Sequence, residues 1–388
     1  MTTTTRVNTR TTHRAVVRAD GTVTVLDRPT PVPDEHELLL APVYAGLCGT
    51  DIQMLRGLRS DPSPVIGHEG VARVVAAGGG VPEHLAPGTL VCVNPTHPGD
   101  PSFLLGHNVD GLLQERVLIA ASAVRDGLVL PLPAANSTEN AALLEPLAVV
   151  HYALGLLAGH RPHTLVVFGD GVVGHLAVRA APVLLGAGTR IVHLHHTEQG
   201  VDWSEDHPTP GVQRALNDAA GARLLAELPA DERVAVLLAT PRDATLACLD
   251  TALRTLRGDL AVDLLGGLPP GAASPLLPGT DLVRIRAANC AGVPDPALRF
   301  TAPTDTGATV SLFGHRGVAN GHLATAAAEL VAHPRRYRDL VTHLVDVDEA
   351  AEVMRGLARS RDRTVAGRRL IKLAVRFAPR DDAGGGAG

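Results

Sequence analysis

The hydrophobic pattern of the chain changes near residue 141, and this change limits the fold more than any other feature. Between about residues 14 and 135, short β-type runs such as AVVRA, TVTVLDR and GVARVVAAG are separated by Gly and Pro, which is typical of an all-β unit. After residue 141, β-type runs such as LVVFG and VAVLLAT alternate with helical stretches, as in βαβ units on a parallel sheet. With 388 residues, 45% of them hydrophobic, the chain has enough core material for two domains.

Charge, apolar runs and cysteines exclude several classes of protein. The formal charge is −5 and no block of like charges occurs, so we expect no nucleic-acid partner. The longest apolar run, residues 143–157, contains Glu145 and Pro146 and is shorter than the roughly 20 apolar residues that span a membrane, so we expect no membrane segment. Four widely spaced cysteines indicate reduced thiols and a cytoplasmic protein. By composition, residues 1–13 are expected to be a disordered tail and residues 377–388 a flexible one.

The segment GDGVVG, residues 169–174, directly follows the run LVVF and directly precedes an apolar helical stretch. Its three glycines match the dinucleotide fingerprint, which needs a tight turn, a bare backbone against the pyrophosphate and close packing of helix on strand. The helix N-terminus would then offer N–H groups to the anion. A glycine-rich turn without a ligand is the alternative. The residues expected at this site are Gly169, Gly171, Val172, Val173 and Gly174.

The next strand lacks the acidic residue that usually binds the ribose hydroxyls about 20 residues after the glycines. Its end carries His195, His196 and Thr197 instead, and no Arg stands there to pair with a 2′-phosphate. We take His195 as the candidate contact at this position. The pattern leaves NAD and NADP both open, and solvated strand-end histidines are the alternative.

A second group of residues combines Cys48 in GLCGTD with His68 and Glu69 in GHEG. A thiolate, an imidazole and a carboxylate from separate loops suit zinc, which takes S, N and O ligands and keeps one position open in catalytic sites. A buried cysteine and a satisfied core histidine would give the same residues. The spacing alone therefore leaves both interpretations open.

Together these motifs resemble the zinc-dependent medium-chain alcohol dehydrogenase family of the MDR superfamily. The resemblance extends from about residue 14 to residue 376 and is closest to the sorbitol, threonine and cyclitol dehydrogenase branch. The motifs that carry it are GLCGTD at 46–51, GHEG at 67–70, DGLLQERVLI at 110–119, EPLAV at 145–149 and GDGVVG at 169–174.

The resemblance implies an α/β plus β fold with two domains. Residues 14–150 and 315–376 would form a GroES-like catalytic domain, and residues 151–314 an inserted Rossmann-fold cofactor-binding domain. It also implies a homodimer or a homotetramer.

The resemblance further implies a ligand set. Cys48, His68 and Glu69 match the catalytic zinc positions, and Glu145 matches a glutamate that polyol and threonine dehydrogenases carry near the metal. Asp51 would orient His68, as carboxylates often do for ligating imidazoles.

A proton path is implied in part. Thr50 matches the hydroxyl that passes the alcohol proton toward solvent. Gln53 stands where relatives often have a relay histidine, and an amide cannot exchange a proton near pH 7. The proton would therefore leave through water, the cofactor ribose or another histidine.

Two departures from the family pattern lie elsewhere in the chain. Relatives commonly place four close cysteines after the strand that here reads TLVCVNP, but this chain has only Cys92, and one thiol cannot form a tetrahedral cage. We expect one catalytic zinc and no structural zinc, with His97 and His107 as solvated loop histidines. The long segment 268–310, rich in Pro and Gly, could be a pocket, a subunit contact or a surface loop.

Two further cofactor contacts are expected. Gly266, together with Gly267, is placed to let the cofactor pass close, and Arg369 is the candidate for its phosphates.

The sequence thus predicts a zinc-dependent NAD(P) alcohol dehydrogenase. It would transfer hydride reversibly between the nicotinamide and a polar secondary alcohol such as a polyol, a cyclitol or an amino alcohol, including intermediates of secondary metabolism. One alternative is a zinc-independent enone or quinone reductase of the same superfamily. Another is a catalytically silent member that only binds the cofactor.

Overall fold

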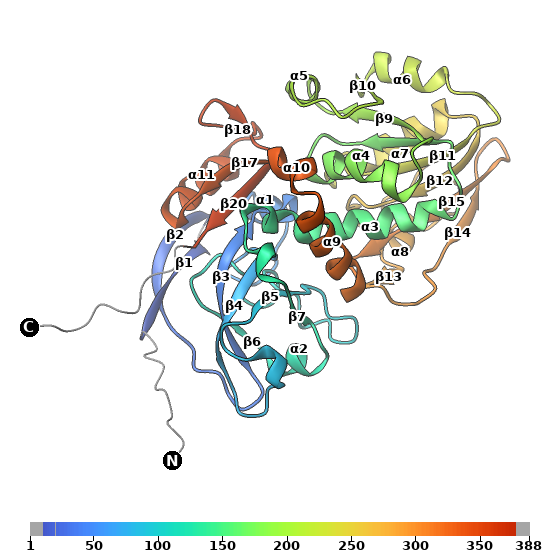
Figure 1. The fold of residues 1–388 in the computed structure, drawn as a ribbon. Coiled ribbons are helices and arrows are strands. Elements are labelled where there is room, and N and C mark those ends of the chain that lie inside the picture. The colour runs from blue at the N-terminus through green and yellow to red at the C-terminus, as the bar shows by residue number, and fades with distance from the viewer. Residues whose placement is uncertain (1–10, 20, 378–388) are drawn as a thin grey trace, which may run out of the picture. The chain divides into compact units, whose positions relative to one another are not determined.

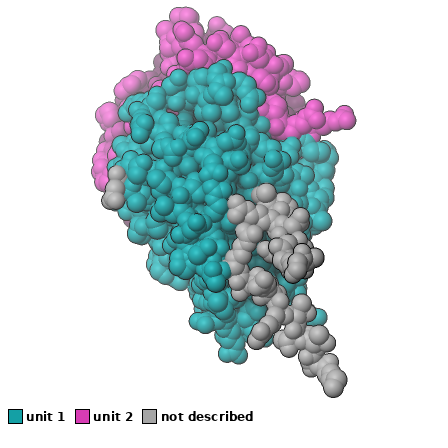
Figure 2. Space-filling model, turned by 90° about the vertical axis from the view of Figure 1, so that its left-hand side faces the viewer, with its two compact units in different colours: residues 1–145, 327–334, 341–388 teal, residues 146–326, 335–340 magenta. Residues whose placement is uncertain are grey.

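The computed structural model describes residues 11–19 and 21–377, and the chain divides into two compact units. Unit 1 comprises residues 1–145, 327–334 and 341–388, and unit 2 comprises residues 146–326 and 335–340 (Figure 2). Each unit has its own sheet and its own buried core.

Unit 1 contains a mostly antiparallel sheet of seven strands (Figure 1). The strands of the whole unit, including two separate pairs, are β1 (Thr12–Ala19), β2 (Thr22–Pro29), β3 (Leu38–Gly46), β4 (Glu69–Ala77), β5 (Leu90–Val93), β6 (Val117–Ile119), β7 (Val129–Pro131), β17 (Val341–Val345), β18 (Thr364–Val365), β19 (Arg368–Arg369) and β20 (Lys372–Arg376). The sheet order is β17-β20-β3-β4-β5-β7 with β6 also paired to β3, while β1 pairs with β2 and β18 with β19. All of β5 and the first four residues of β20 are buried, so these strands of the sheet are covered on both faces.

The helices of unit 1 are short except for one near its C-terminal end. They are α1 (Gly49–Leu55), the 3-10 helix Glu83–Leu85, α2 (Ala121–Arg125), the 3-10 helices Ala134–Asn136 and Glu139–Leu143, and α11 (Val347–Arg359). Helix α11 begins at a capping box, in which Asp346 accepts hydrogen bonds from the backbone N–H groups of Asp348 and Glu349. Ala350, Met354 and Leu357 follow at helical spacing and are buried in the unit 1 core.

Unit 2 contains a seven-stranded sheet in which all strands but one are parallel. The strands of the whole unit, including one separate pair, are β8 (Thr164–Phe168), β9 (Arg190–His195), β10 (Val212–Leu216), β11 (Arg233–Leu238), β12 (Asp259–Asp263), β13 (Asn289–Cys290), β14 (Phe300–Pro303), β15 (Thr309–Phe313) and β16 (His315–Arg316). The sheet order is β10-β9-β8-β11-β12-β15-β14, with the pair β13-β16 separate. The strand order reverses between β8 and β11, and parallel sheets bind ligands beyond the carboxyl ends of their strands at such a point.

Helices connect the parallel strands of unit 2 (Figure 1). They are α3 (Leu144–Ala158), α4 (Val172–Leu184), α5 (Glu198–Asp206), α6 (Ala219–Ala226), α7 (Thr245–Thr255), α8 (Leu282–Arg286), α9 (Asn320–Ala332), α10 (Pro334–Tyr337) and the 3-10 helix Arg338–Leu340. The first two residues of α3 and the last six of α9 belong to unit 1. Strand β8 is buried along its whole length, as expected for a parallel strand covered on both faces.

The sequence placed the domain divisions at 150/151 and 314/315, whereas the units divide at 145/146 and 326/327. Strand β16 pairs with β13, and this pairing holds His315 and Arg316 in unit 2. The segment 268–310, for which the sequence leaves a pocket, a subunit contact and a surface loop open, contains α8, β13 and the edge strand β14.

Three residues that were predicted to lie in the terminal tails belong to the folded part of the protein. Thr12 and His13 belong to β1, and His13 is buried with its Nε2 3.1 Å from Gln114 Oε1. Phe377 is also buried, and its backbone N–H donates to Val43 O. The prediction was wrong for these residues because pairing with distant parts of the chain orders them. The rest of the two predicted tails, residues 1–10 and 378–388, lies outside the described residues.

One helical stretch, Glu139–Ala158, is long and apolar enough to cross a membrane. Its most apolar window is 72% buried inside the protein. Core helices of globular proteins have the same length and composition, so this stretch is weak evidence for a membrane segment.

Unit 2 buries a carboxylate beside an imidazole. Asp263 ends β12, and its Oδ2 lies 3.5 Å from Nε2 of the equally buried His315. Neither oxygen of Asp263 has a hydrogen-bond partner among the described residues. Burial raises the pKa of Asp263 to about 7, although Arg286 partly opposes this, and burial lowers the pKa of His315 to about 3.

The raised pKa of Asp263 predicts a pH-dependent stability. The folded state binds this proton more tightly than the unfolded state, so the stabilisation is complete in acid and is lost as the pH rises through about 7. Between about pH 4 and pH 8, the free energy of unfolding of the wild type should fall relative to that of Asp263→Asn by up to about 4 kcal/mol. Denaturant unfolding of both proteins measures this difference. Parallel pH curves for the two proteins would contradict it.

Candidate functional site

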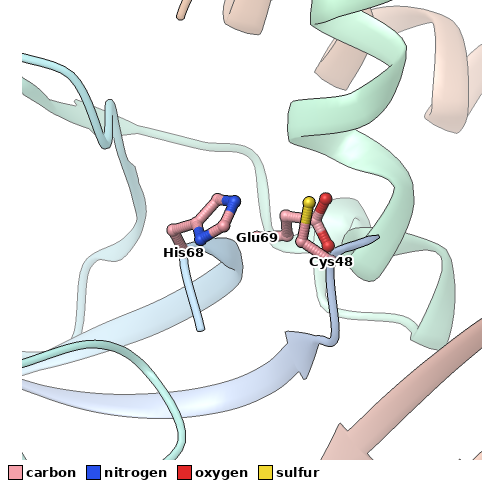
Figure 3. A group of neighbouring side chains, drawn as sticks. All are labelled: Cys48, His68 and Glu69. Atoms are coloured by element: carbon pink, nitrogen blue, oxygen red, sulfur yellow. The ribbon is translucent and has the colours of Figure 1, made fainter. Parts of the chain in front are cut away.

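Cys48, His68 and Glu69 converge in unit 1 (Figure 3), and their ligand atoms all lie within 4.8 Å of one another. Cys48 follows β3 and precedes α1, while Glu69 begins β4. Because β3 and β4 are antiparallel with Gly46 opposite Glu69, the end of β3 lies beside the start of β4. This pairing is what brings GLCGTD and GHEG together.

Gly70 allows this close approach. It follows Glu69 with a φ of +157°, and a Cβ at this position would lie 2.1 Å from Tyr44 O in β3. The second glycine of GHEG is therefore required by the strand pairing.

Asp51 lies behind the three candidate ligands and is fully buried. Its Oδ2 accepts a hydrogen bond of 2.8 Å from the backbone N–H of Cys48, and its Oδ1 lies 3.7 Å from Nδ1 of His68. Burial alone would lower the pKa of His68, but the negative charges of Asp51 and Cys48 raise it well above its ordinary value. Burial, followed by the charge of Glu69, raises the pKa of the Cys48 thiol. A site whose donors favour a positive charge in this way is also suited to a metal cation.

Lys372 is the only lysine of the chain, and it is buried against Glu69. Its Nζ forms an ion pair with Glu69 Oε2 and donates to Leu47 O at 3.2 Å. The sequence analysis missed this contact, which joins residues 303 positions apart. The signal that could have suggested it is a charged residue within the otherwise apolar strand segment LIKLAV.

Glu145 lies near the same charges but outside the group of three. It is in the first turn of α3 and is 9% exposed. Burial raises its pKa to about 7, with a further contribution from the negative charge of Glu69. The group whose ligand atoms lie within 4.8 Å of one another contains Cys48, His68 and Glu69 but not Glu145.

His97 and His107 are buried, so the prediction that they are solvated was wrong. His97 Nε2 lies 2.8 Å from Asp126 Oδ2, and the His107 ring centroid lies 4.9 Å from that of His68. Their loop folds back into unit 1, and this tertiary burial leaves no mark on the local sequence. Cys92 is buried in β5, where burial raises the pKa of its thiol to about 12.

The GDGVVG segment of unit 2 forms a turn between β8 and α4. Gly169 has a φ of +118°, and a Cβ on Gly174 would lie 1.9 Å from Gly169 O. Gly171 is the N-cap of α4, and no described side chain caps this helix. The N–H groups of its first turn are therefore suited to an anion.

The other candidate cofactor residues have local packing roles. His195 ends β9 and is fully buried, with its ring centroid 4.1 Å from that of His193, so the solvated alternative does not apply to it. A Cβ on Gly266 would lie 2.4 Å from Thr245 Oγ1. Arg369 lies in β19, in unit 1, opposite Thr364.

Comparisons with known proteins agree with this geometry. Residues 34–131 match the alcohol dehydrogenase GroES-like domain. A sorbitol dehydrogenase of Halalkalibacterium halodurans is 27% identical over 53% of this chain and 66% of its own length. A glucose 1-dehydrogenase of Thermoproteus tenax is 32% identical over 38% of this chain and 48% of its own length. The chain thus matches about half to two thirds of the length of these curated relatives.

Solved structures extend the likeness to nearly the whole chain. Galactitol-1-phosphate dehydrogenase from Escherichia coli has a TM-score of 0.68 at 19% identity and covers 94% of this chain and 100% of its own. An alcohol dehydrogenase from Thermotoga maritima has a TM-score of 0.69 at 16% identity, with 94% and 99% covered. The chain is thus similar in sequence to sorbitol and glucose dehydrogenases and shares the fold of the solved dehydrogenase structures. The predicted fold class, a GroES-like domain with a Rossmann-like parallel sheet, is confirmed.

The ion pair beside the candidate ligands gives a testable stability difference. In metal-free protein, Lys372→Met leaves Glu69 buried without its cation, and breaking a buried pair in this way costs about 3–5 kcal/mol. Adding Glu69→Gln removes the stranded charge and should restore most of that loss. Denaturant unfolding of the wild type, both single variants and the double variant forms the cycle. Additive effects of the two changes would contradict the coupling.

Proposed function

We propose that this protein is a zinc-dependent NAD(P) alcohol dehydrogenase that transfers hydride reversibly between a polar secondary alcohol and the nicotinamide. The observation that carries the proposal is the convergence of Cys48, His68 and Glu69 in one unit, with a dinucleotide-type loop in the other. The three candidate ligands alone could be ordinary core residues, and the loop alone could be a glycine-rich turn without a ligand. Their combination in one chain favours hydride transfer.

The donor set fits zinc. One sulfur, one nitrogen and one oxygen donor lie together, on half-buried Cys48 and on buried His68 and Glu69. His68 Nδ1 has no hydrogen-bond partner among the described residues. Cys48, His68 and Glu69 would hold the ion, with Glu145 beside it. When bound, the ion supplies a Lewis acid that lowers the pKa of the substrate hydroxyl. We propose one catalytic zinc and no structural zinc.

Residues around the ligands have separate tasks. Asp51 orients the His68 imidazole, and Lys372 balances the charge of Glu69 within the core. The Thr50 hydroxyl is buried and has no hydrogen-bond partner among the described residues, so it is available to accept the alcohol proton and pass it on. Gln53 supplies no titrating group for the next step, which therefore falls to water, the cofactor ribose or another histidine.

The dinucleotide binds at the turn between β8 and α4. The backbone of Gly169, Gly171, Val172, Val173 and Gly174 would hold the pyrophosphate, because these residues form the turn and the uncapped first turn of α4. Remaining contacts proposed for the cofactor are His195, Gly266 and Arg369.

The proposed substrate is a polyol, a cyclitol or an amino alcohol. The similar proteins are named for sorbitol, glucose and galactitol 1-phosphate, all of which are polyhydroxylated compounds. We further propose a homodimer or homotetramer in the cytoplasm, and the four free cysteines are consistent with a reducing compartment.

A second candidate is a zinc-independent reductase of the same superfamily acting on an enone or a quinone. The ion pair between Lys372 and Glu69 favours it, because a buried ammonium group already balances one candidate ligand. In that case the dinucleotide site would operate without a metal.

Metal content separates the two candidates. Elemental analysis of protein purified without chelator or added metal should find about one zinc per chain. Cys48→Ser should lose it and reduce turnover of secondary alcohols by at least about a hundredfold, since loss of an outer-shell residue alone costs 10–100-fold. Cys290→Ser, which removes a similarly half-buried thiol in unit 2, is the matched control. A zinc-free wild type with undiminished nicotinamide-dependent reduction would support the reductase instead.

The role of Thr50 predicts a change in rate without loss of metal. Thr50→Val keeps the shape but removes the hydroxyl, so kcat for alcohol oxidation should fall by about 10²-fold, while Thr50→Ser stays near wild type. Zinc content measured alongside should be equal in all three proteins. Equal kcat values for the Val and Ser variants would exclude this proton path.

A further inference from the structure

The end of β9 is where dinucleotide-binding sheets usually carry an acidic residue for the ribose hydroxyls. In this chain β9 ends with His195, which is buried. A carboxylate nevertheless lies at this strand end, and it comes from the second residue of GDGVVG. Asp170 Oδ2 accepts hydrogen bonds from the backbone N–H of Thr197 at 3.2 Å and from its hydroxyl at 3.0 Å.

Sheet register explains how the loop reaches this place. Strands β8 and β9 are parallel neighbours, with Phe168 opposite Leu194. The residues that follow them, Gly169 and Asp170 on one side and His195 to Thr197 on the other, therefore leave the same edge of the sheet side by side. This is the edge at which a dinucleotide would bind.

The start of α5 makes room for the carboxylate. Thr197 caps α5 by accepting a hydrogen bond from Gly200 N. A Cβ on Gly200 would lie only 2.1 Å from Asp170 Oδ2. A larger residue at position 200 would displace the Asp170 side chain, so the glycine maintains its position.

A second contact from β9 fixes the backbone of the loop. His193 is buried, and its Nε2 lies 2.8 Å from Gly169 O, which as a carbonyl can only accept the hydrogen bond. Burial lowers the pKa of His193 to about 4, so the ring is neutral at physiological pH with its proton on Nε2. Gly169 N donates to Leu194 O at 2.9 Å. Both polar backbone groups of the residue before Asp170 are therefore held by β9.

Building on the proposed function, we propose that Asp170 determines the choice of cofactor: its carboxylate accepts a hydroxyl of the adenosine ribose and repels a 2′-phosphate, so the enzyme uses NAD(H) in preference to NADP(H). A carboxylate has about four acceptor positions, so it can accept a ribose hydroxyl in addition to bonds from protein groups. Asp170 thus replaces, from the loop, the acid that β9 lacks.

One nearby cation, Arg214, does not lie at the strand ends. It is opposite His193, in the middle of β10 and two residues before the end of that strand. Asp170 lies at the strand ends, where the ribose would bind, so a 2′-phosphate there would meet its negative charge.

Direct binding measurements test the assignment without requiring turnover. Titration of the full chain with NADH and NADPH, followed by nucleotide fluorescence, should give a Kd for NADH at least about tenfold lower than that for NADPH. Asp170→Asn keeps the shape and one acceptor oxygen but removes the charge. In this variant the Kd for NADPH should fall by about tenfold, with a smaller change for NADH.

Two further variants separate charge selection from other effects. Asp231→Asn makes the same charge change in the turn before β11, at the amino ends of the parallel strands and so away from the proposed nucleotide site. It should leave both Kd values unchanged. His193→Leu removes the donor to Gly169 O and should weaken both nucleotides by a similar factor of about ten, while His193→Gln restores a donor and most of the affinity. A change in the ratio of the NADPH Kd to the NADH Kd identifies Asp170 as the residue that selects the cofactor. An equal loss of affinity for both nucleotides identifies His193 as a positioning residue.

The outcomes also distinguish this proposal from the function on which it rests. A wild type that prefers NADPH, or an unchanged Kd ratio in Asp170→Asn, would overturn the role of Asp170 and leave the dehydrogenase proposal intact. A wild type that binds neither nucleotide would overturn both.

Discussion

The ion pair between Lys372 and Glu69 is the interaction on which the candidate metal site of unit 1 depends. It joins β20 to the start of β4, beside the end of β3, and both charges are almost completely buried. Gly46 makes room for it, since a Cβ there would lie 2.6 Å from Lys372 Cε. Two charges are costly to bury, and such a pair is tolerated only when each has its partner. The arrangement of Cys48, His68 and Glu69 therefore depends on a residue near the other end of the chain.

The fold and the residues of both candidate sites could be predicted from the sequence because their signals are local. GDGVVG determines a turn within six residues, and the change of hydrophobic period near residue 141 separates the two sheets. The partners of these motifs could not be predicted in the same way. Lys372, the ring of His107 and the strand end that receives Asp170 reach their positions only through tertiary packing. The tail prediction was wrong at Thr12 and His13 for the same reason.

The two units hold their polar groups in different ways. In unit 1, opposite charges are buried together, so the pKa of His68 rises and Glu69 is paired with an ammonium group. In unit 2, burial keeps imidazoles neutral, as the lowered pKa values of His193 and His315 show. The first arrangement suits a cation, whereas in unit 2 the backbone N–H groups at the start of α4 suit an anion.

The burial of Lys372 also determines how the protein meets reagents and enzymes that act on amines. Apart from Lys372, the basic residues of the Lys and Arg class are all arginines, which carry no ε-amino group. The one ε-amino group of the chain is therefore that of Lys372, which is enclosed in the core of unit 1. Succinimidyl esters, aldehyde cross-linkers and the enzymes that acetylate or ubiquitinate lysine therefore find no accessible ε-amino group on the folded protein. Coupling to a support or a dye has to use cysteine, carboxylate or the α-amino group, and resistance of Lys372 itself to amine reagents becomes a direct sign that unit 1 is folded.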